Sequence, residues 1–175
     1  MLNLQDKLFM KRFCLPVNSD IDLYENGLNN VNVCLCGHYN HVACILQFYK
    51  GNGNMKKIKI LSFGMNQMAD SKGLNPGVHA EQDALNKLPS VKYKKKLETI
   101  SMLVLRLSSK NKLQSSKPCA NCIESMKIYP IKKGYRIHNI YHSDGEGNII
   151  KTTLHDLDND TKHYSRYYRQ RERPY

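Results

Sequence analysis

A membrane-spanning helix needs an apolar run of about 18 residues, and the 175-residue chain contains no such run. Its first residues, MLNLQDKLFMKRF, lack the long apolar stretch and the small-residue cleavage site of a secretory signal peptide. We therefore expect no membrane span and a cytoplasmic location. That compartment is reducing, so the six cysteines are predicted to be thiols or metal ligands and not disulfides.

Internal repeats and linkers rich in Gly, Ser or Pro are also absent, and the length suits one domain with a single core. Apolar residues make up 41% of the chain and aromatic residues 9%, which excludes disorder throughout. We divide the chain into an N-terminal arm and first helical region (1–40), a central domain (41–155) and a C-terminal segment rich in Tyr and Arg (156–175).

Acidic side chains are scarce, with 15 Asp and Glu against 27 Lys and Arg, and the net charge is +12. Such an excess favours polyanionic partners, of which nucleic acid is the usual one. A chain that is merely well solvated accounts for the charge equally well, because charge alone does not report on chemistry.

The end of the chain, HYSRYYRQRERPY, interleaves arginines with tyrosines. Arginine binds phosphates through two parallel hydrogen bonds, and tyrosine stacks on bases. We therefore predict nucleic-acid contacts at Arg166, Arg169, Arg171 and Tyr167. The alternative is an amphipathic helix whose tyrosines pack on the domain.

Hydrophobic periodicity predicts strands that alternate with helices. The expected strands cover 41–49, 57–63, 100–107, 137–142 and 149–154, and the expected helices cover 21–28, 79–88 and 119–129. The GNGN turn at 51–54 makes a hairpin of the first two strands. Pro89 is expected to stop one helix, and Pro118 to open the next, which Pro130 and Gly134 end. We predict an α/β fold, a mixed five-stranded sheet with helices on its faces and its last two strands antiparallel.

Two short motifs fall at predicted helix starts, His79-Ala80-Glu81 and Pro118-Cys119-Ala120-Asn121-Cys122. Zinc prefers four tetrahedral ligands such as thiolate and imidazole, and a catalytic zinc keeps one position open. The free N–H groups of a helix start stabilise thiolates. His79, Cys119 and Cys122 are therefore candidate ligands of Zn²⁺; the alternatives are a closed zinc site or two unrelated helix caps.

Glu81 lies two residues from His79, so the two side chains do not share one direction on a helix. Its carboxylate can instead reach over the open side of the metal. That position suits a proton carrier and not a fourth ligand.

The H-x-E…P-C-x-x-C arrangement resembles the signature of the cytidine deaminase-like superfamily, over about residues 40 to 155. The resemblance implies a three-layer fold, zinc on His79, Cys119 and Cys122, and proton transfer by Glu81. It also places Asn66, in the FGMN loop, where relatives have an Asn that contacts the sugar, and it assigns Pro118 to substrate binding. Gln67 departs from nucleoside-specific relatives, which have a Glu nearby for the ribose.

The resemblance implies hydrolytic conversion of a cytosine base to uracil, on a nucleotide or on single-stranded nucleic acid. One alternative is a salvage deaminase of free cytidine or deoxycytidine; another is a non-catalytic, zinc-stabilised module that binds nucleic acid. Relatives are often dimers or tetramers, so a homo-oligomer is also among the expected assemblies.

Two further patterns have a functional and a structural interpretation. Cys34, Cys36, His38 and His41 could bind a second metal or form a loop with buried thiols. Asp156, Asp158 and Asp160 alternate as in a calcium loop but lack its Gly and distant Glu, which favours a solvated turn.

Overall fold

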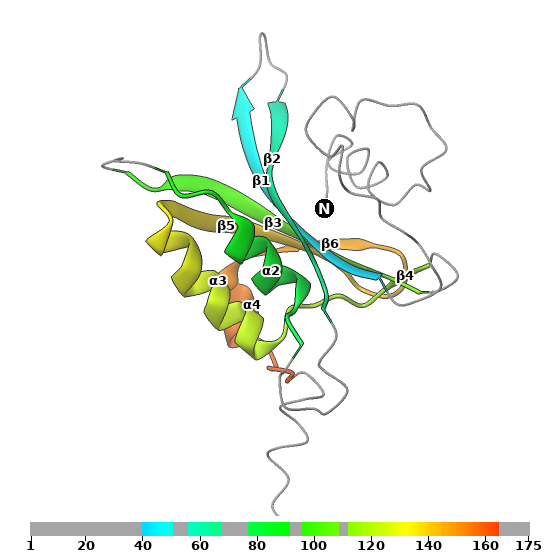
Figure 1. The fold of residues 1–175 in the computed structure, drawn as a ribbon. Helices are drawn as coiled ribbons and strands as arrows, with labels where there is room; N and C mark the ends of the chain where they lie inside the picture. Colours follow the sequence, from blue (N-terminus) through cyan, green and yellow to red (C-terminus); the bar gives the residue numbers. More distant parts are fainter. Residues whose placement is uncertain (1–39, 51–55, 68–76, 92–95, 109–111, 165–175) are drawn as a thin grey trace, which may run out of the picture.

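The strands of the protein form one mixed sheet, and helices pack against one of its faces (Figure 1). The computed structural model describes residues 40–50, 56–67, 77–91, 96–108 and 112–164. Among the helices of these segments, none is long and apolar enough to cross a bilayer.

Six strands make up the described sheet, and five of them follow the order β2-β1-β3-β5-β6. Strands β3 and β5 are parallel, and the other pairs are antiparallel. This confirms a mixed sheet with an antiparallel final pair. The strands are β1 (Asn40–Lys50), β2 (Lys56–Met65), β3 (Glu98–Leu107), β4 (Leu113–Gln114), β5 (Tyr135–Ser143) and β6 (Ile149–Thr152).

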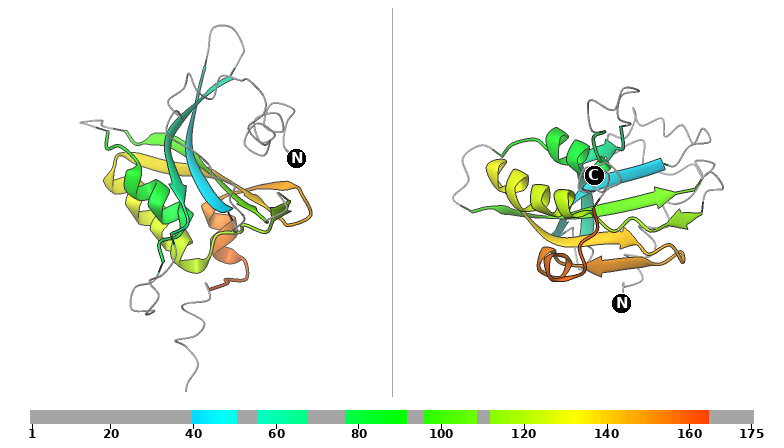
Figure 2. Two further views of the ribbon diagram at one scale, coloured as in Figure 1. Left: turned by 45° about the vertical axis from the view of Figure 1, so that its right-hand side comes forward. Right: turned by 90° about the horizontal axis from the view of Figure 1, so that it is seen from below.

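The described helices are α2 (Ala80–Lys87), α3 (Ala120–Lys132) and α4 (Leu154–Asn159). All three contribute to one apolar cluster, in which Leu85, Ile123 and Leu157 meet the sheet. Figure 2 shows α2 and α3 side by side across the strands. The prediction that Pro89 ends a helix is confirmed for α2, because the preceding Leu88 has the extended backbone that a following proline favours.

The opposite face of the sheet is also apolar. Cys44, Leu46 and Tyr141 lie in a second buried cluster, to which no residue of α2, α3 or α4 belongs. The described helices thus form one layer only. The helix expected over 21–28 lies outside the described residues.

Three expectations about the sheet and α3 need correction. The expected five-stranded sheet has a sixth strand, because Leu113 and Gln114 pair with the end of β3. Helix α3 continues through Pro130 to Lys132, and the turn after it contains Gly134 at a φ of 88°. Pro118 does not open that helix, since Cys119 is its N-cap.

The segment around Asp156 and Asp158 is a helix and not the expected solvated turn. Thr153 caps α4: its hydroxyl accepts from the Asp156 N–H, and the Asp156 carboxylate accepts from the Thr153 N–H. This reciprocal pair is a capping box, in which an aspartate takes the place of the usual glutamate. Leu157 is 3% exposed and packs α4 into the core.

Candidate metal centre

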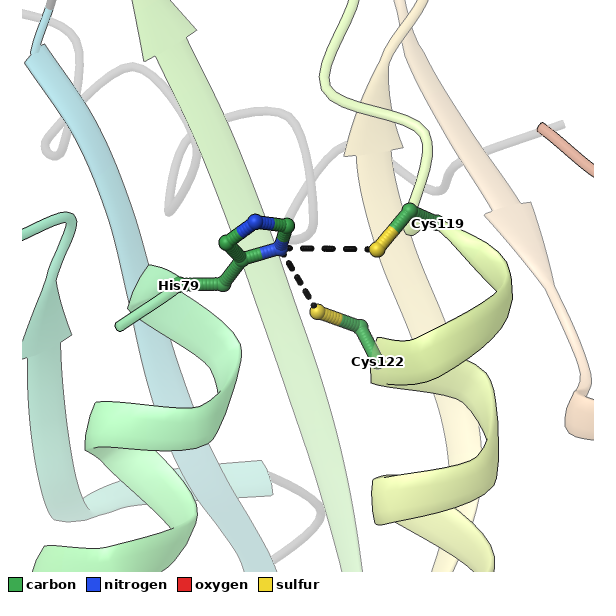
Figure 3. Close-up of side chains that lie close together, drawn as sticks. All are labelled: His79, Cys119 and Cys122. Atoms are coloured by element: carbon green, nitrogen blue, oxygen red, sulfur yellow. Dashed lines mark hydrogen bonds between the residues drawn. The ribbon is translucent and has the colours of Figure 1, made fainter. Parts of the chain in front are cut away.

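The starts of α2 and α3 bring three metal-binding side chains together (Figure 3). His79 is the N-cap of α2, Cys119 is the N-cap of α3, and Cys122 lies in the first turn of α3. The Nδ1 atom of His79 lies 3.2 Å from Cys122 Sγ and 3.4 Å from Cys119 Sγ. Within the described residues this is the one group of three or more potential ligands.

The distances fit a tetrahedral zinc ion. Bonds of about 2.0 Å to nitrogen and about 2.3 Å to sulfur separate those two ligands by about 3.5 Å in a tetrahedron. The observed separations of 3.2 and 3.4 Å are close to that value. Of the three described cysteines, none forms a disulfide, so both sulfurs of the cluster are available to a metal. The donor set therefore fits a metal ion with three protein ligands.

Metal binding requires deprotonated sulfur and neutral imidazole, and the two sulfurs of the cluster differ in ionisation. The hydrogen bond with Cys119 and then burial raise the pKa of the Cys122 thiol. Hydrogen bonds from Cys122 and then from His79 lower the pKa of the Cys119 thiol, against the opposing effect of burial. The hydrogen bond to Cys119 raises the pKa of His79. The geometry thus stabilises one thiolate before any metal is considered.

Glu81 lies inside the protein next to this cluster. It is 1% exposed, and its Oε2 atom has no hydrogen-bond partner in the described part of the chain. Its negative charge is close enough to raise the pKa of His79, after the larger effect of the Cys119 hydrogen bond. A buried carboxylate oxygen is costly without a partner, so its position indicates a role toward a bound molecule.

The backbone of α2 lies very close to the backbone of β2 at Gly64. A Cβ atom on Gly64 would lie 2.1 Å from the Ala80 carbonyl oxygen and 2.3 Å from the Ala84 nitrogen. Nearby, the Ser62 hydroxyl donates to the Ala84 carbonyl at 2.8 Å. The Met65 N–H donates to Asp83 Oδ2 at 3.0 Å. These contacts fix where His79 and Glu81 lie.

The start of α3 is held by polar contacts. The Ser116 hydroxyl donates to the Val104 carbonyl and accepts from the Ser143 N–H, both at 2.8 Å. The Ser116 N–H donates to the Ser143 carbonyl at 2.9 Å. Ser116 is 2% exposed, so this network is buried. It fixes the loop that leads to Cys119 on β3 and β5.

The segment after α4 crosses the start of α3. The Ala120 N–H, next to Cys119, donates to the His163 carbonyl at 3.0 Å. Lys117, two residues before Cys119, forms an ion pair with Asp160 at 2.6 Å. The end of the described chain is thus tied to the half of the centre that carries both cysteines.

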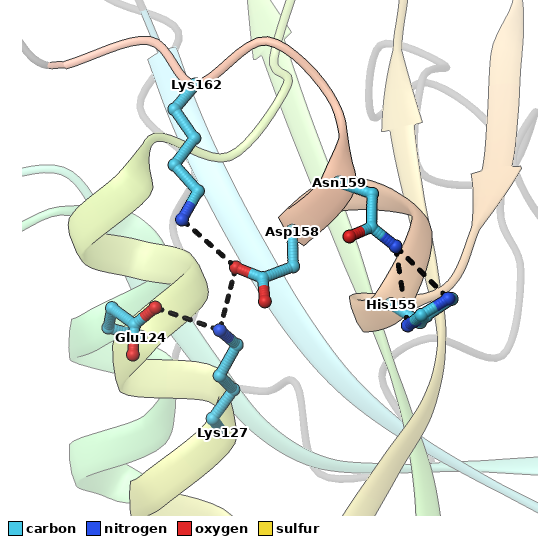
Figure 4. Close-up of polar contacts among 6 residues, drawn as sticks. All are labelled: Glu124, Lys127, His155, Asp158, Asn159 and Lys162. Carbon is cyan, nitrogen blue, oxygen red and sulfur yellow. Dashed lines mark hydrogen bonds and ion pairs between the residues drawn. The ribbon is translucent and has the colours of Figure 1, made fainter.

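Ion pairs join α4 to α3 (Figure 4). Lys127 of α3 lies 2.8 Å from Asp158 of α4 and 2.9 Å from Glu124. Lys162 lies 3.3 Å from the same Asp158 oxygen. The aspartates that resembled a calcium loop therefore have structural partners.

The predicted substrate residues lie around the centre. Asn66 is exposed, and its N–H donates to the His41 carbonyl at 3.0 Å. The Gln67 N–H donates to the Val78 carbonyl at 2.8 Å, directly before His79. These bonds bring the loop after β2 to the start of β1 and to the metal cluster. Pro118 is buried beside Cys119.

Several candidate residues lie outside the described residues. These are Arg166, Arg169, Arg171 and Tyr167 of the C-terminal segment, and Cys34, Cys36 and His38 of the second predicted metal group. The fourth member of that group, His41, is described. Burial lowers its pKa, and the charges of Glu81 and His79 lie close enough to act on it, so it belongs near those two residues. Motif spacing could not indicate this, because it grouped His41 with its neighbours in the chain.

Comparison of the chain with protein-family models, with curated proteins and with solved structures gives no significant match.

Proposed function

We propose that the protein is a zinc-dependent hydrolytic deaminase that converts a cytosine base to uracil. One observation carries the proposal: a His-Cys-Cys cluster with zinc-compatible spacing lies beside a buried glutamate with an unpartnered oxygen. The H-x-E…P-C-x-x-C signature gives these same residues the roles of ligands and proton carrier. The proposal includes the three-layer deaminase fold, which the order of strands and helices supports.

His79, Cys119 and Cys122 would hold the zinc. When bound, zinc polarises a water molecule and makes it acidic enough to lose a proton near neutral pH. Glu81 would accept that proton on Oε2, the oxygen that has no hydrogen-bond partner in the described residues. It then delivers protons to the ring nitrogen and to the leaving ammonia, so that water and cytosine give uracil and ammonia.

The number of ligands supports a catalytic site over a structural one. A closed structural zinc has four protein ligands, whereas the cluster in the described residues offers three. A non-catalytic module would also have no need of a buried carboxylate at this position. Glu81 therefore favours the enzyme over the binding module.

For the substrate we propose a phosphate-bearing cytosine compound, a nucleotide or a single-stranded nucleic acid. The net charge of +12 favours anions. The segment that precedes the Arg-rich end of the chain is tied to the start of α3, next to Cys119. Gln67, where nucleoside-specific relatives have a Glu, removes one reason to prefer free cytidine. Free cytidine is the alternative.

The test combines metal content with turnover. Purified protein refolded with zinc should contain about one zinc per chain and should form uracil from CMP, dCMP or a cytosine-containing oligonucleotide faster than from cytidine. A metal content near zero, or no uracil from any of the four compounds, would contradict the proposal. Faster turnover of cytidine than of the other three would leave a deaminase but make the salvage alternative correct.

A further inference from the structure

His41 stands on the helix-facing side of β1, at the end of the strand where α2 and α3 begin. Side chains alternate along a strand. Ala43 and Ile45 lie in the cluster that the helices cover, whereas Cys44 and Leu46 lie in the cluster on the opposite face. His41 therefore continues the row of Ala43 and Ile45, one step beyond the core.

The charges around His41 are those of the metal centre and of Arg106. Burial is the main cause that lowers its pKa. The charges of Glu81 and Cys119 raise that pKa, and the charges of His79 and Arg106 lower it. His41 is nevertheless not a member of the ligand cluster, which consists of His79, Cys119 and Cys122. His41 therefore lies next to the centre without being one of the candidate metal ligands.

The Nε2 atom of His41 is buried without a hydrogen-bond partner in the described part of the chain, as Glu81 Oε2 is. Buried polar atoms nearly always have a partner, and a missing one indicates a ligand or a catalytic role. Asn121, between the two cysteines in the chain, has a third such atom, Nδ2. Unpartnered atoms on His41 and Glu81 beside one metal centre indicate a polar molecule that contacts both. Arg106 lies opposite His41 in the β1–β3 ladder, and its positive charge acts on His41.

We propose that His41 is a substrate-binding residue whose Nε2 donates a hydrogen bond to an oxygen of the pyrimidine nucleotide held at the metal centre. This inference rests on the proposed deaminase function and adds a recognition contact to it. His41 would hold the nucleotide in place while Glu81 moves protons.

The test separates substrate binding from stability through two variants. His41→Phe keeps a planar ring and removes both nitrogens, and His41→Gln keeps an amide nitrogen near the position of Nε2. Each is combined with Glu81→Gln, so that CMP binds without turnover, and the zinc-loaded proteins are titrated with CMP. Loss of one hydrogen bond should weaken CMP binding about tenfold in the Phe variant, while the Gln variant should stay within about threefold.

Stability should respond in the opposite way. A buried nitrogen without a partner stabilises nothing, so His41→Phe should unfold at the same urea concentration as the parent or a higher one. Zinc content should stay at one per chain in all variants. Binding that weakens while stability and zinc persist is the signature of a substrate contact.

Four outcomes would overturn the inference. Two concern binding: unchanged CMP affinity in His41→Phe, or equally weakened CMP affinity in the Phe and Gln variants. Two concern structure: loss of zinc in His41→Phe, or failure of both His41→Phe and His41→Leu to fold. The proposed function is judged separately on the parent protein. If the parent deaminates cytosine and His41→Phe is as active and binds as well, only the role of His41 is wrong. If the parent neither binds CMP nor forms uracil, both proposals fail.

Discussion

The two helix starts that form the metal centre are held in place by different kinds of contact. The start of α2, with His79 and Glu81, lies on β2 where Gly64 leaves no room for a side chain. The start of α3, with both cysteines, is held by the Ser116 network and by the segment after α4. The half that carries His79 and Glu81 is thus fixed chiefly by steric fit, with hydrogen bonds from Ser62 and Met65 beside it. The half with the thiols is fixed by hydrogen bonds and an ion pair.

This difference has a physical consequence. Steric contact between backbones cannot yield without moving a whole helix, whereas a hydrogen bond can be weakened one partner at a time. Substitutions beneath α2 should therefore affect folding and activity together. Substitutions around the start of α3 should give graded effects.

Gly64→Ala should have the largest effect on stability, because the added Cβ would clash with the backbone of α2. The new Cβ would lie 2.1 Å from the Ala80 carbonyl oxygen, and neither group is a flexible side chain. We expect a loss of about 3 kcal/mol or more in the free energy of unfolding, measured by urea denaturation. Gly147→Ala is the matched control: nothing lies within 4 Å of the new Cβ, and only its φ of 95° is unfavourable. That variant should lose about 1 kcal/mol, and equal losses in the two would show that steric fit is not the cause.

Glu81→Gln tests whether Glu81 transfers protons while the cysteines of the other half bind zinc. The change keeps the shape of the side chain and removes the base, so turnover should fall at least about a hundredfold while zinc remains. Cys119→Ala should release zinc and lose turnover together with it, because it removes a proposed ligand. Both variants lose uracil formation, so elemental analysis of zinc distinguishes them. Release of zinc by Glu81→Gln would make Glu81 a ligand and the assigned role wrong.

Ser116→Ala should destabilise the α3 half by about 1 to 3 kcal/mol, because the Ser143 N–H and the Val104 carbonyl lose a buried partner. Ser125→Ala is its control within α3. The Ser125 hydroxyl donates to the Asn121 carbonyl four residues earlier, a bond that contributes little to a helix. Similar urea midpoints for the two variants would argue against a special role of the Ser116 network.

Deletion of residues 165–175 should weaken binding of single-stranded nucleic acid without affecting zinc. These residues follow the segment that is tied to the start of α3. For every phosphate that the shortened protein no longer binds, the slope of log affinity against log salt should become shallower by about 0.7. An unchanged slope would show that the charges of the C-terminal segment do not bind phosphates. An unfolded product would show that its tyrosines pack on the domain.

The smallest effect concerns pH. Hydrogen bonds from Lys127 and then Lys162 lower the pKa of Asp158 below its ordinary value of 3.8. A lowered carboxyl pKa stabilises the fold fully above the unfolded value, and that contribution disappears as the pH falls through the folded value. Stability should therefore decline slightly below about pH 4. Asp158→Asn should show less of this decline in urea titrations between neutral and acidic pH; identical slopes would exclude the contribution of Asp158.

Much of the fold could be read from local patterns. The GNGN turn at 51–54, the apolar run before it and the alternating run after it predicted the β1–β2 hairpin, and it is present. The strand β4 and the helix α4 escaped prediction for different reasons. Two residues are too few to show periodicity, and the polar sequence of α4 depends on its Thr153 cap and on Lys127 of a distant helix.

By itself the sequence determined which side chains were candidate metal ligands. The spacing of His79, Cys119 and Cys122 identified three candidate ligands at helix starts, and their ligand atoms lie within 4.8 Å of one another. Only the tertiary structure decided which other groups face that centre. His41 and the segment around His163 are remote from the two motifs in the chain, and strand alternation and the packing of α4 bring them there. Motif spacing is local, whereas the surroundings of a site depend on long-range packing.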